Sequence, residues 1–167
     1  YRLTLPRMRA LGLDLGSKRI GVALSTSDGV LATPYEVVQR NGDRAREHRK
    51  IAELAAEAEA EVIVVGMPYH LDGRLSPNAK AALEEAEQLR DACGLPVETY
   101  DERLTTVTAA RSLKEMNLNP AARRRAIDQV AAAVMLQAWL DHRRENTPNQ
   151  DPLNQDLPDP DQPEQDQ

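Results

Sequence analysis

The sequence is poor in several residue types on which common protein classes depend. It has one cysteine, Cys93, which excludes an internal disulfide and a cysteine-based zinc site. It has four tyrosines, one tryptophan and no phenylalanine, which argues against stacking of single-stranded bases on aromatic rings. No apolar run approaches the roughly 20 residues of a membrane-spanning helix, and the first residues lack the apolar core of a signal peptide. We therefore expect a cytoplasmic protein without a membrane partner.

Acidic residues are in excess, with 27 Asp and Glu against 21 Lys and Arg and a net charge of −6. The excess lies in residues 146–167, which contain six acidic residues, five prolines and no Lys or Arg. Such a segment buries too little apolar surface to offset its ordering entropy, so we predict a disordered acidic tail rich in Pro, Asp and Gln. Residues 1–145 are formally neutral. We predict an N-terminal extension over 1–8 and a single domain over 9–145.

The apolar pattern predicts an α/β protein in the order β-β-β-α-β-α-β-α-α. Short polar turns separate the first three strands, which therefore should be antiparallel, and the later strands alternate with helices. The strands are expected at 10–15, 20–25, 30–38, 62–65 and 95–100, and the helices at 41–60, 77–93, 105–116 and 120–143. Val62–Val65 is continuously apolar, which is typical of a strand that is buried on both faces of a sheet.

One acidic residue, Asp14, lies inside the first predicted strand. A carboxylate there must be paired, protonated or bound to a cation, because burying it alone costs several kcal/mol. Gly12 and Gly16 flank it and would allow a ligand or another backbone to approach closely. A satisfied structural Asp is the competing interpretation.

Further acidic residues stand at two other places in the chain. Asp101 and Glu102 end the fifth predicted strand, where ligands collect in open α/β sheets. Strand alternation sends the two to opposite faces, so at most one shares the direction of Asp14. Asp128 heads an apolar stripe on the last helix, too far from its start to be explained by the helix dipole. For Asp101 and Glu102 the competing interpretation is a solvated acid pair, and for Asp128 it is an ordinary acid on a helix.

A first strand, a later strand end and a closing helix can bring three carboxylates to one point. Oxygen ligands without a Cys or His cluster favour a hard cation, Mg²⁺ or Mn²⁺. Such a site could hold two metals on either side of a phosphodiester, activating water and stabilising the leaving oxygen.

Four segments in order resemble the motifs of the YqgF/RuvX family, which is associated with Holliday-junction resolution and pre-16S rRNA processing. Gly12–Ala23 resembles the opening motif, and Val64–Pro68 with Asp72-Gly73 resembles the second. Asp101–Thr106 and Ile127–Ala132 are similar to the third and the last. The resemblance covers about residues 9–143, and the four motifs together are specific.

The resemblance implies an RNase H-like fold with a five-stranded mixed sheet and helices on both faces. It implies a divalent-metal-dependent nuclease acting on structured nucleic acid, and it identifies Asp14, Glu102 and Asp128 as the metal-binding and catalytic acids, with Asp101 a rival to Glu102. We expect 5′-end processing of pre-16S rRNA, for which a single compact domain suffices. The alternative is a Holliday junction resolvase, which would require two active sites and hence a homodimer rather than a monomer.

Basic residues near these motifs are candidates for contact with nucleic acid. Lys18 and Arg19, in the turn after Asp14, and Arg103, beside the acid pair, are placed to meet phosphate. Further arginines and a lysine interleave with acids around the first helix, and we interpret them as a solvated helix face. They are Arg40, Arg44, Arg46, Arg49 and Lys50. His48, His70 and His142 are scattered, and we expect none of them to be catalytic.

Two other classes of protein remain to be weighed. A sugar-kinase or actin-like ATPase has a similar first phosphate loop, but it needs two such domains, and this chain supplies one. A catalytically idle nucleic-acid or ribosome-associated module would keep the fold with structural acids, and added Mn²⁺ would then change neither its stability nor its activity.

Overall fold

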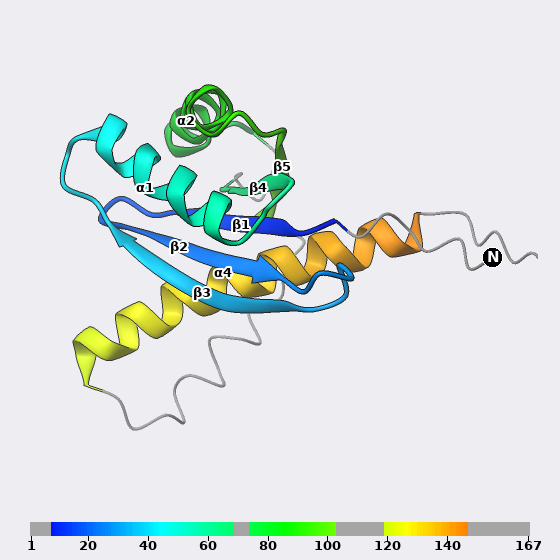
Figure 1. Ribbon diagram of the computed structural model, residues 1–167. Helices are drawn as coiled ribbons and strands as arrows, with labels where there is room; N and C mark the ends of the chain where they lie inside the picture. Colours follow the sequence, from blue (N-terminus) through cyan, green and yellow to red (C-terminus); the bar gives the residue numbers. More distant parts are fainter. Residues whose placement is uncertain (1–7, 69–73, 103–118, 147–167) are drawn as a thin grey trace, which may run out of the picture.

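The computed structural model describes residues 8–68, 74–102 and 119–146, which form a five-stranded mixed sheet with helices on both faces (Figure 1). The sheet order is β3-β2-β1-β4-β5. Its strands are β1 (Ala10–Leu15), β2 (Arg19–Ser25), β3 (Ala32–Gln39), β4 (Val62–Met67) and β5 (Val97–Asp101). The helices are α1 (Arg44–Glu57), α2 (Pro77–Cys93) and α4 (Pro120–Glu145). The predicted mixed sheet and its covering helices are confirmed.

The pairing of the strands follows the two kinds of connection in the chain. Short turns join β1, β2 and β3, which pair antiparallel, while crossovers through α1 and α2 make β1, β4 and β5 parallel. The carboxyl ends of β1, β4 and β5 therefore meet at one edge of the sheet. The turn between β1 and β2 lies at this same edge. The segment between β3 and α1 lies beside it, because the Arg40 amide donates to the Lys18 carbonyl.

Each helix begins at a side-chain cap that the sequence provides. Asp43 accepts a hydrogen bond from the Arg46 amide at the start of α1. Ser76 and Asn119 cap α2 and α4 in the same way, and each is followed by a proline at the first helical position. The predicted helix over 41–60 is therefore too long, because Asp43 caps it and Gly42, at φ 84°, cannot belong to its first turn.

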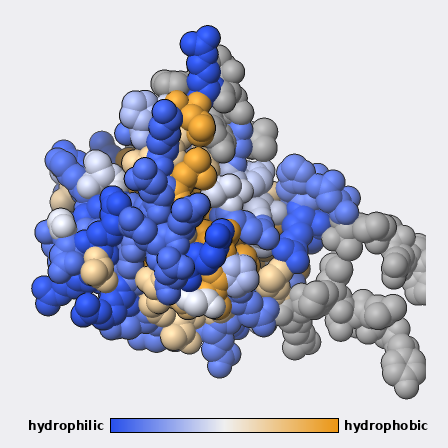
Figure 2. All heavy atoms as spheres, turned by 90° about the horizontal axis from the view of Figure 1, so that it is seen from above, coloured by the Kyte–Doolittle hydropathy of each residue, from blue (hydrophilic) through white to orange (hydrophobic). Residues whose placement is uncertain are grey.

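Strand alternation divides the apolar core into two layers. One face of the sheet packs Leu11, Leu13, Ile63 and Val65 against α1 and α2. The other face packs small and branched residues of β1, β2 and β4 against α4, whose core residues include Ala132, Met135, Leu136 and Trp139. Every residue of β4 is buried, as its sequence predicts. Viewed from the side of α1 and α2, the surface is largely hydrophilic (Figure 2).

Several predictions concern residues outside the described ranges. They are residues 1–7 of the N-terminal extension, His70, the Asp72-Gly73 motif, Arg103, the helix expected at 105–116 and the acidic tail beyond Asn146. The division into an extension, one domain over 9–145 and a tail stays a prediction. Among the described helices, none is long and apolar enough to cross a membrane.

Candidate metal-binding and nuclease site

Asp14 and Glu102 meet at the edge where the parallel strands end. Asp14 is the second-last residue of β1 and pairs with Gly21 of β2, while Glu102 directly follows β5. Their carboxyl groups are joined by a hydrogen bond, which spans the intervening strand β4. Two carboxyl groups that share a hydrogen bond must also share a proton, or else a cation must hold them together. Two of the three predicted acids are thus neighbours.

A missing side chain in β4 makes this meeting possible. Gly66 lies between the two acids in the sheet, and a Cβ atom built on it would stand 2.7 Å from Oε1 of Glu102. The Glu102 side chain thus lies back over the Gly66 backbone towards Asp14. The carboxyl group of Glu102 occupies the space above Gly66, and a larger residue at position 66 would displace it.

Strand register decides which of the two adjacent acids meets Asp14. Glu98 hydrogen-bonds to Trp139 of α4, and Tyr100 packs in the layer beneath α4, so the even-numbered residues of β5 face that helix. Asp14 faces the same way, since Leu13 and Leu15 pack on the opposite side. Glu102 follows this parity and Asp101 does not. Asp101 still raises the pKa of Glu102 through its charge.

Both carboxyl groups of the pair hold their protons more tightly than usual. Burial raises the pKa of Asp14, and the charge of Asp128 raises it further, although the hydrogen bond from Glu102 partly opposes them. Burial is also the first cause for Glu102, followed by the charge of Asp14 and the hydrogen bond to it, and together they raise the pKa of Glu102 to about 7. A cation in place of the shared proton would relieve this repulsion.

The third acid, Asp128, lies close enough to Asp14 to act on its pKa but is bound to an arginine. Its Oδ2 accepts a hydrogen bond from Nε of Arg19 at 2.5 Å, and about a quarter of each side chain is exposed. Within residues 8–68, 74–102 and 119–146, no three acid, His or Cys side chains lie close enough together to hold a metal ion. For both oxygens of Asp128 to be available to a cation, Arg19 must turn away from it.

The donor set of this site suits a hard divalent ion. Asp14 and Glu102 supply adjacent carboxyl oxygens, the ligands that Mg²⁺ and Mn²⁺ prefer. Of the three residues predicted to contact nucleic acid, the structure describes two. Lys18 is exposed in the β1–β2 turn, Arg19 is engaged by Asp128, and Arg103 lies outside the described residues.

A pocket of about 560 Å³ opens beside the acid pair on the side of α1 and α2. Asp14, Glu102 and Gly66 line one end of it, and Arg40 and Glu85 line the other. The burial of Arg40 corrects the interpretation of the basic residues as one solvated helix face, whereas Arg44, Arg46, Arg49 and Lys50 are exposed. Arg40 precedes α1 and is largely buried, and Glu47, one of the acids interleaved with these basic residues, is buried as well.

The raised pKa of Glu102 predicts how the stability of the metal-free protein depends on pH. Between its ordinary pKa of 4.5 and about 7, the folded state holds a proton that the unfolded state has lost. The free energy of unfolding should therefore fall as the pH rises through this window and level off above it. Urea denaturation in EDTA at pH 5 and pH 8 measures the difference. Glu102→Gln should abolish most of it, and an unchanged pH dependence in that variant would contradict the assignment.

Known proteins are similar to this chain in fold and in sequence. The solved structure described as "T. thermophilus RuvC in complex with Holliday junction substrate" aligns with a TM-score of 0.55 at 18% identity, covering 83% of this chain and 97% of that one. This likeness defines the class by its fold, which is RNase H-like. Residues 8–142 match the family model RuvX, described as Holliday junction resolvase, and the chain belongs to this family of nucleases.

Relatives in mycobacteria are similar over the same region. A protein of Mycobacterium sp. (strain KMS), named "Putative pre-16S rRNA nuclease", is 50% identical over 139 residues, which cover 83% of this chain and 82% of the relative. A protein of the same name from Mycobacterium tuberculosis (strain CDC 1551 / Oshkosh) is 49% identical over 139 residues, covering 82% of this chain and 81% of the relative. The expected family is confirmed.

Proposed function

We propose that this nuclease trims the 5′ end of pre-16S rRNA with the help of a bound divalent ion, Mg²⁺ or Mn²⁺. The observation that carries the proposal is the hydrogen-bonded pair of Asp14 and Glu102, in a chain that is 50% identical to a relative named for that activity. A cytoplasmic location belongs to the same proposal.

The residues of the site have separate tasks in this proposal. Asp14 and Glu102 hold the cation, and Asp128 completes the ligand set when Arg19 releases it. A divalent ion there would activate water and neutralise charge that develops on the phosphate. Arg19, once released, and Lys18 are then available to bind phosphate oxygens beside the reacting group. Arg103 remains a candidate for the same task.

A second candidate substrate is the four-way DNA junction, which the description of the matching family favours. Symmetric resolution of a junction needs two active sites, and so a homodimer, whereas trimming one RNA end needs only a monomer. The oligomeric state therefore separates the two candidates.

A cleavage assay with both substrates tests the proposal. The full chain is incubated with a 5′-extended pre-16S rRNA fragment and with a four-way DNA junction, in Mg²⁺, in Mn²⁺ and in EDTA. We expect cleavage of the RNA that requires the cation, and a monomer by sedimentation with and without junction DNA. Cleavage of the junction by a dimer would instead support the second candidate. Cleavage of neither substrate, together with no effect of Mn²⁺ on stability, would leave a catalytically idle module.

A further inference from the structure

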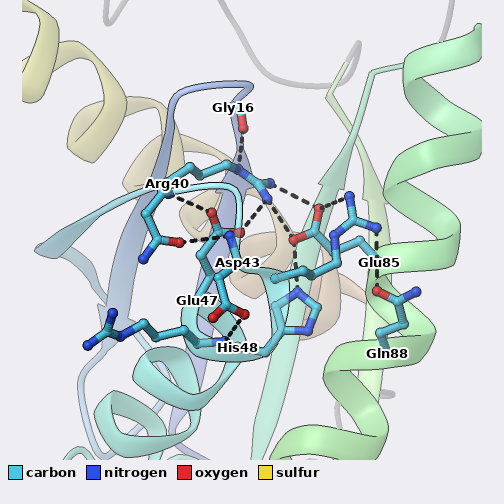
Figure 3. Close-up of polar contacts among 10 residues, drawn as sticks. Gly16, Arg40, Asp43, Glu47, His48, Glu85 and Gln88 are labelled. Carbon is cyan, nitrogen blue, oxygen red and sulfur yellow. Dashed lines mark hydrogen bonds and ion pairs between the residues drawn. The ribbon is translucent and has the colours of Figure 1, made fainter.

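A buried cluster of charged side chains lies behind the β1–β2 turn, between α1 and α2 (Figure 3). It consists of Arg40, Glu47, His48 and Glu85. The side chains of the two glutamates and the histidine are 4–5% exposed, and that of Arg40 is 13% exposed. Charged groups are buried this deeply only when they are paired, and each of these has a partner in the cluster. The sequence pattern predicts a solvated helix face for Arg40 and no catalytic role for His48, so it does not indicate this cluster.

Arg40 contacts three elements at once. Its Nη1 and Nη2 donate to the two oxygens of Glu85 on α2 at 2.9 and 3.0 Å, and Nη1 also lies 3.3 Å from Oε2 of Glu47 on α1. Its third donor, Nε, points the other way and donates to the Gly16 carbonyl at 2.7 Å. A guanidinium group is planar and has five N–H donors in fixed directions, so one side chain can make all these bonds.

The two acids are themselves held in place. Glu47 accepts a hydrogen bond at Oε1 from the Asn41 amide at 3.0 Å, and Oε1 of Glu85 lies 2.9 Å from Nε2 of His48. The guanidinium of Arg40 is therefore fixed by two helices that belong to the core.

The turn leads directly to Asp14. The Gly16 amide donates to the Asp14 carbonyl at 3.0 Å, while the Gly16 carbonyl accepts from Arg40. The backbone amide of Arg40 donates to the Lys18 carbonyl at 2.9 Å, so the same residue holds the turn at two points. A continuous series of hydrogen bonds thus runs from α2 through Arg40 and Gly16 to the backbone of Asp14.

We propose that Arg40 is a positioning residue of the nuclease site: it holds the β1–β2 turn, and with it the backbone of Asp14, at a fixed place relative to α1 and α2. This inference rests on the proposed function of the acid pair. Arg40 lines the same pocket as Asp14 and Glu102 but acts on them through Gly16. Its removal leaves the metal ligands in the chain and loosens the turn on which one of them depends.

Arg40→Lys is the variant that tests this, because it keeps the charge opposite Glu47 and Glu85. A lysine has one nitrogen, so it cannot place separate nitrogens on the two oxygens of Glu85 and on the Gly16 carbonyl as Arg40 does. Arg9→Lys is the matched control, since Nη1 of Arg9 also donates to a backbone carbonyl, that of Ala58, at the far edge of the sheet. The variants are compared by cleavage kinetics, by Mn²⁺ binding and by amide hydrogen exchange.

We expect Arg40→Lys to lower kcat about 10-fold or more and to weaken Mn²⁺ binding by a similar factor, as for other residues that orient metal ligands. KM for the nucleic acid should change less than about twofold, since no bond to the substrate is removed. Amides of the segment 16–19 should exchange faster, while those of β4 stay protected. Arg9→Lys should change none of these quantities.

A lower melting temperature with unchanged kcat, Mn²⁺ affinity and turn exchange would show that Arg40 is only structural, and would overturn the proposal. If Arg40→Lys fails to fold, Glu85→Gln takes its place, since it removes one partner of Arg40 and should increase exchange in the turn. Unchanged exchange there would also overturn it. If the wild-type protein cleaves neither substrate, the proposed function fails, whereas hydrogen exchange and Mn²⁺ binding still decide the role of Arg40.

Discussion

Asp14→Asn is expected to abolish cleavage while leaving the metal-free protein folded and no less stable. An asparagine keeps the size of the side chain but loses the charge that holds a cation. The loss of metal-assisted stabilisation amounts to several kcal/mol, and about 4 kcal/mol corresponds to a rate reduction of about a thousandfold. Stability should not fall, because burial and the charge of Asp128 both raise the pKa of the native carboxyl group. An amide at this position relieves that repulsion.

The experiment needs three measurements on the same protein. Cleavage rate reports the chemistry, isothermal titration with Mn²⁺ reports the cation, and urea denaturation in EDTA reports the fold. Asp43→Asn is a suitable control, because Asp43 caps α1 at the surface and asparagine caps a helix as well as aspartate. Full activity in Asp14→Asn would refute the metal mechanism. Loss of activity with a collapse in stability would instead mean that the carboxylate has a structural role.

The sequence allowed the layout of the sheet to be predicted, because its signals are local. Gly16 to Arg19 separates two apolar runs by a short polar turn, which favours a hairpin. Ser76-Pro77 and Asn119-Pro120 mark helix starts by cap chemistry that acts within one turn, and both helices begin there. The predicted boundaries were less accurate: α1 begins at Arg44 rather than at residue 41, and β3 and β5 each begin two residues later than predicted.

The choice between Asp101 and Glu102 could not be made from the sequence. Alternation shows that the two acids face opposite sides, but it does not show which side carries Asp14. That depends on how β4 and β5 pair in register, with Gly66 beside Tyr100, and register is a property of two strands together. A one-residue shift would exchange the two acids. Which of the two acids lies beside Asp14 follows only from the folded structure.

The buried cluster around Arg40 was missed for a related reason. A glutamate and an arginine near the start of a charged helix have the same sequence signature whether they face water or each other. Glu47, His48 and Ile51 share the buried side of α1, and the spacing of Glu47 and Ile51 by four residues is the one available signal. The partner that makes burial tolerable, Glu85, lies 45 residues from Arg40 in the chain. Pairing over that distance leaves no local pattern.

Gly21→Ala is expected to be the most disruptive single-methyl change in the described part of the site. A Cβ atom at Gly21 would stand 2.1 Å from the carbonyl oxygen of Asp128, which is backbone and cannot rotate away. The first turns of α4 would have to move off β2, at a cost of about 3 kcal/mol as in other overpacked sites. Gly21 also pairs with Asp14, so the shift would separate Asp128 from the acid pair. We therefore expect lower stability and loss of cleavage together.

Gly12→Ala separates these two effects, because it inserts a methyl group under the same helix further along. Its Cβ would stand 2.8 Å from Cβ of Leu136, two turns beyond Asp128, so it should also destabilise the protein. At equal loss of stability, measured by urea denaturation, only Gly21→Ala should lose activity at a temperature where both variants are folded. Retained activity in both variants would mean that the position of Asp128 is unimportant for cleavage. Of the three acids, only Asp14 and Glu102 would then serve the nuclease site, and the bond between Arg19 and Asp128 would join the hairpin to α4.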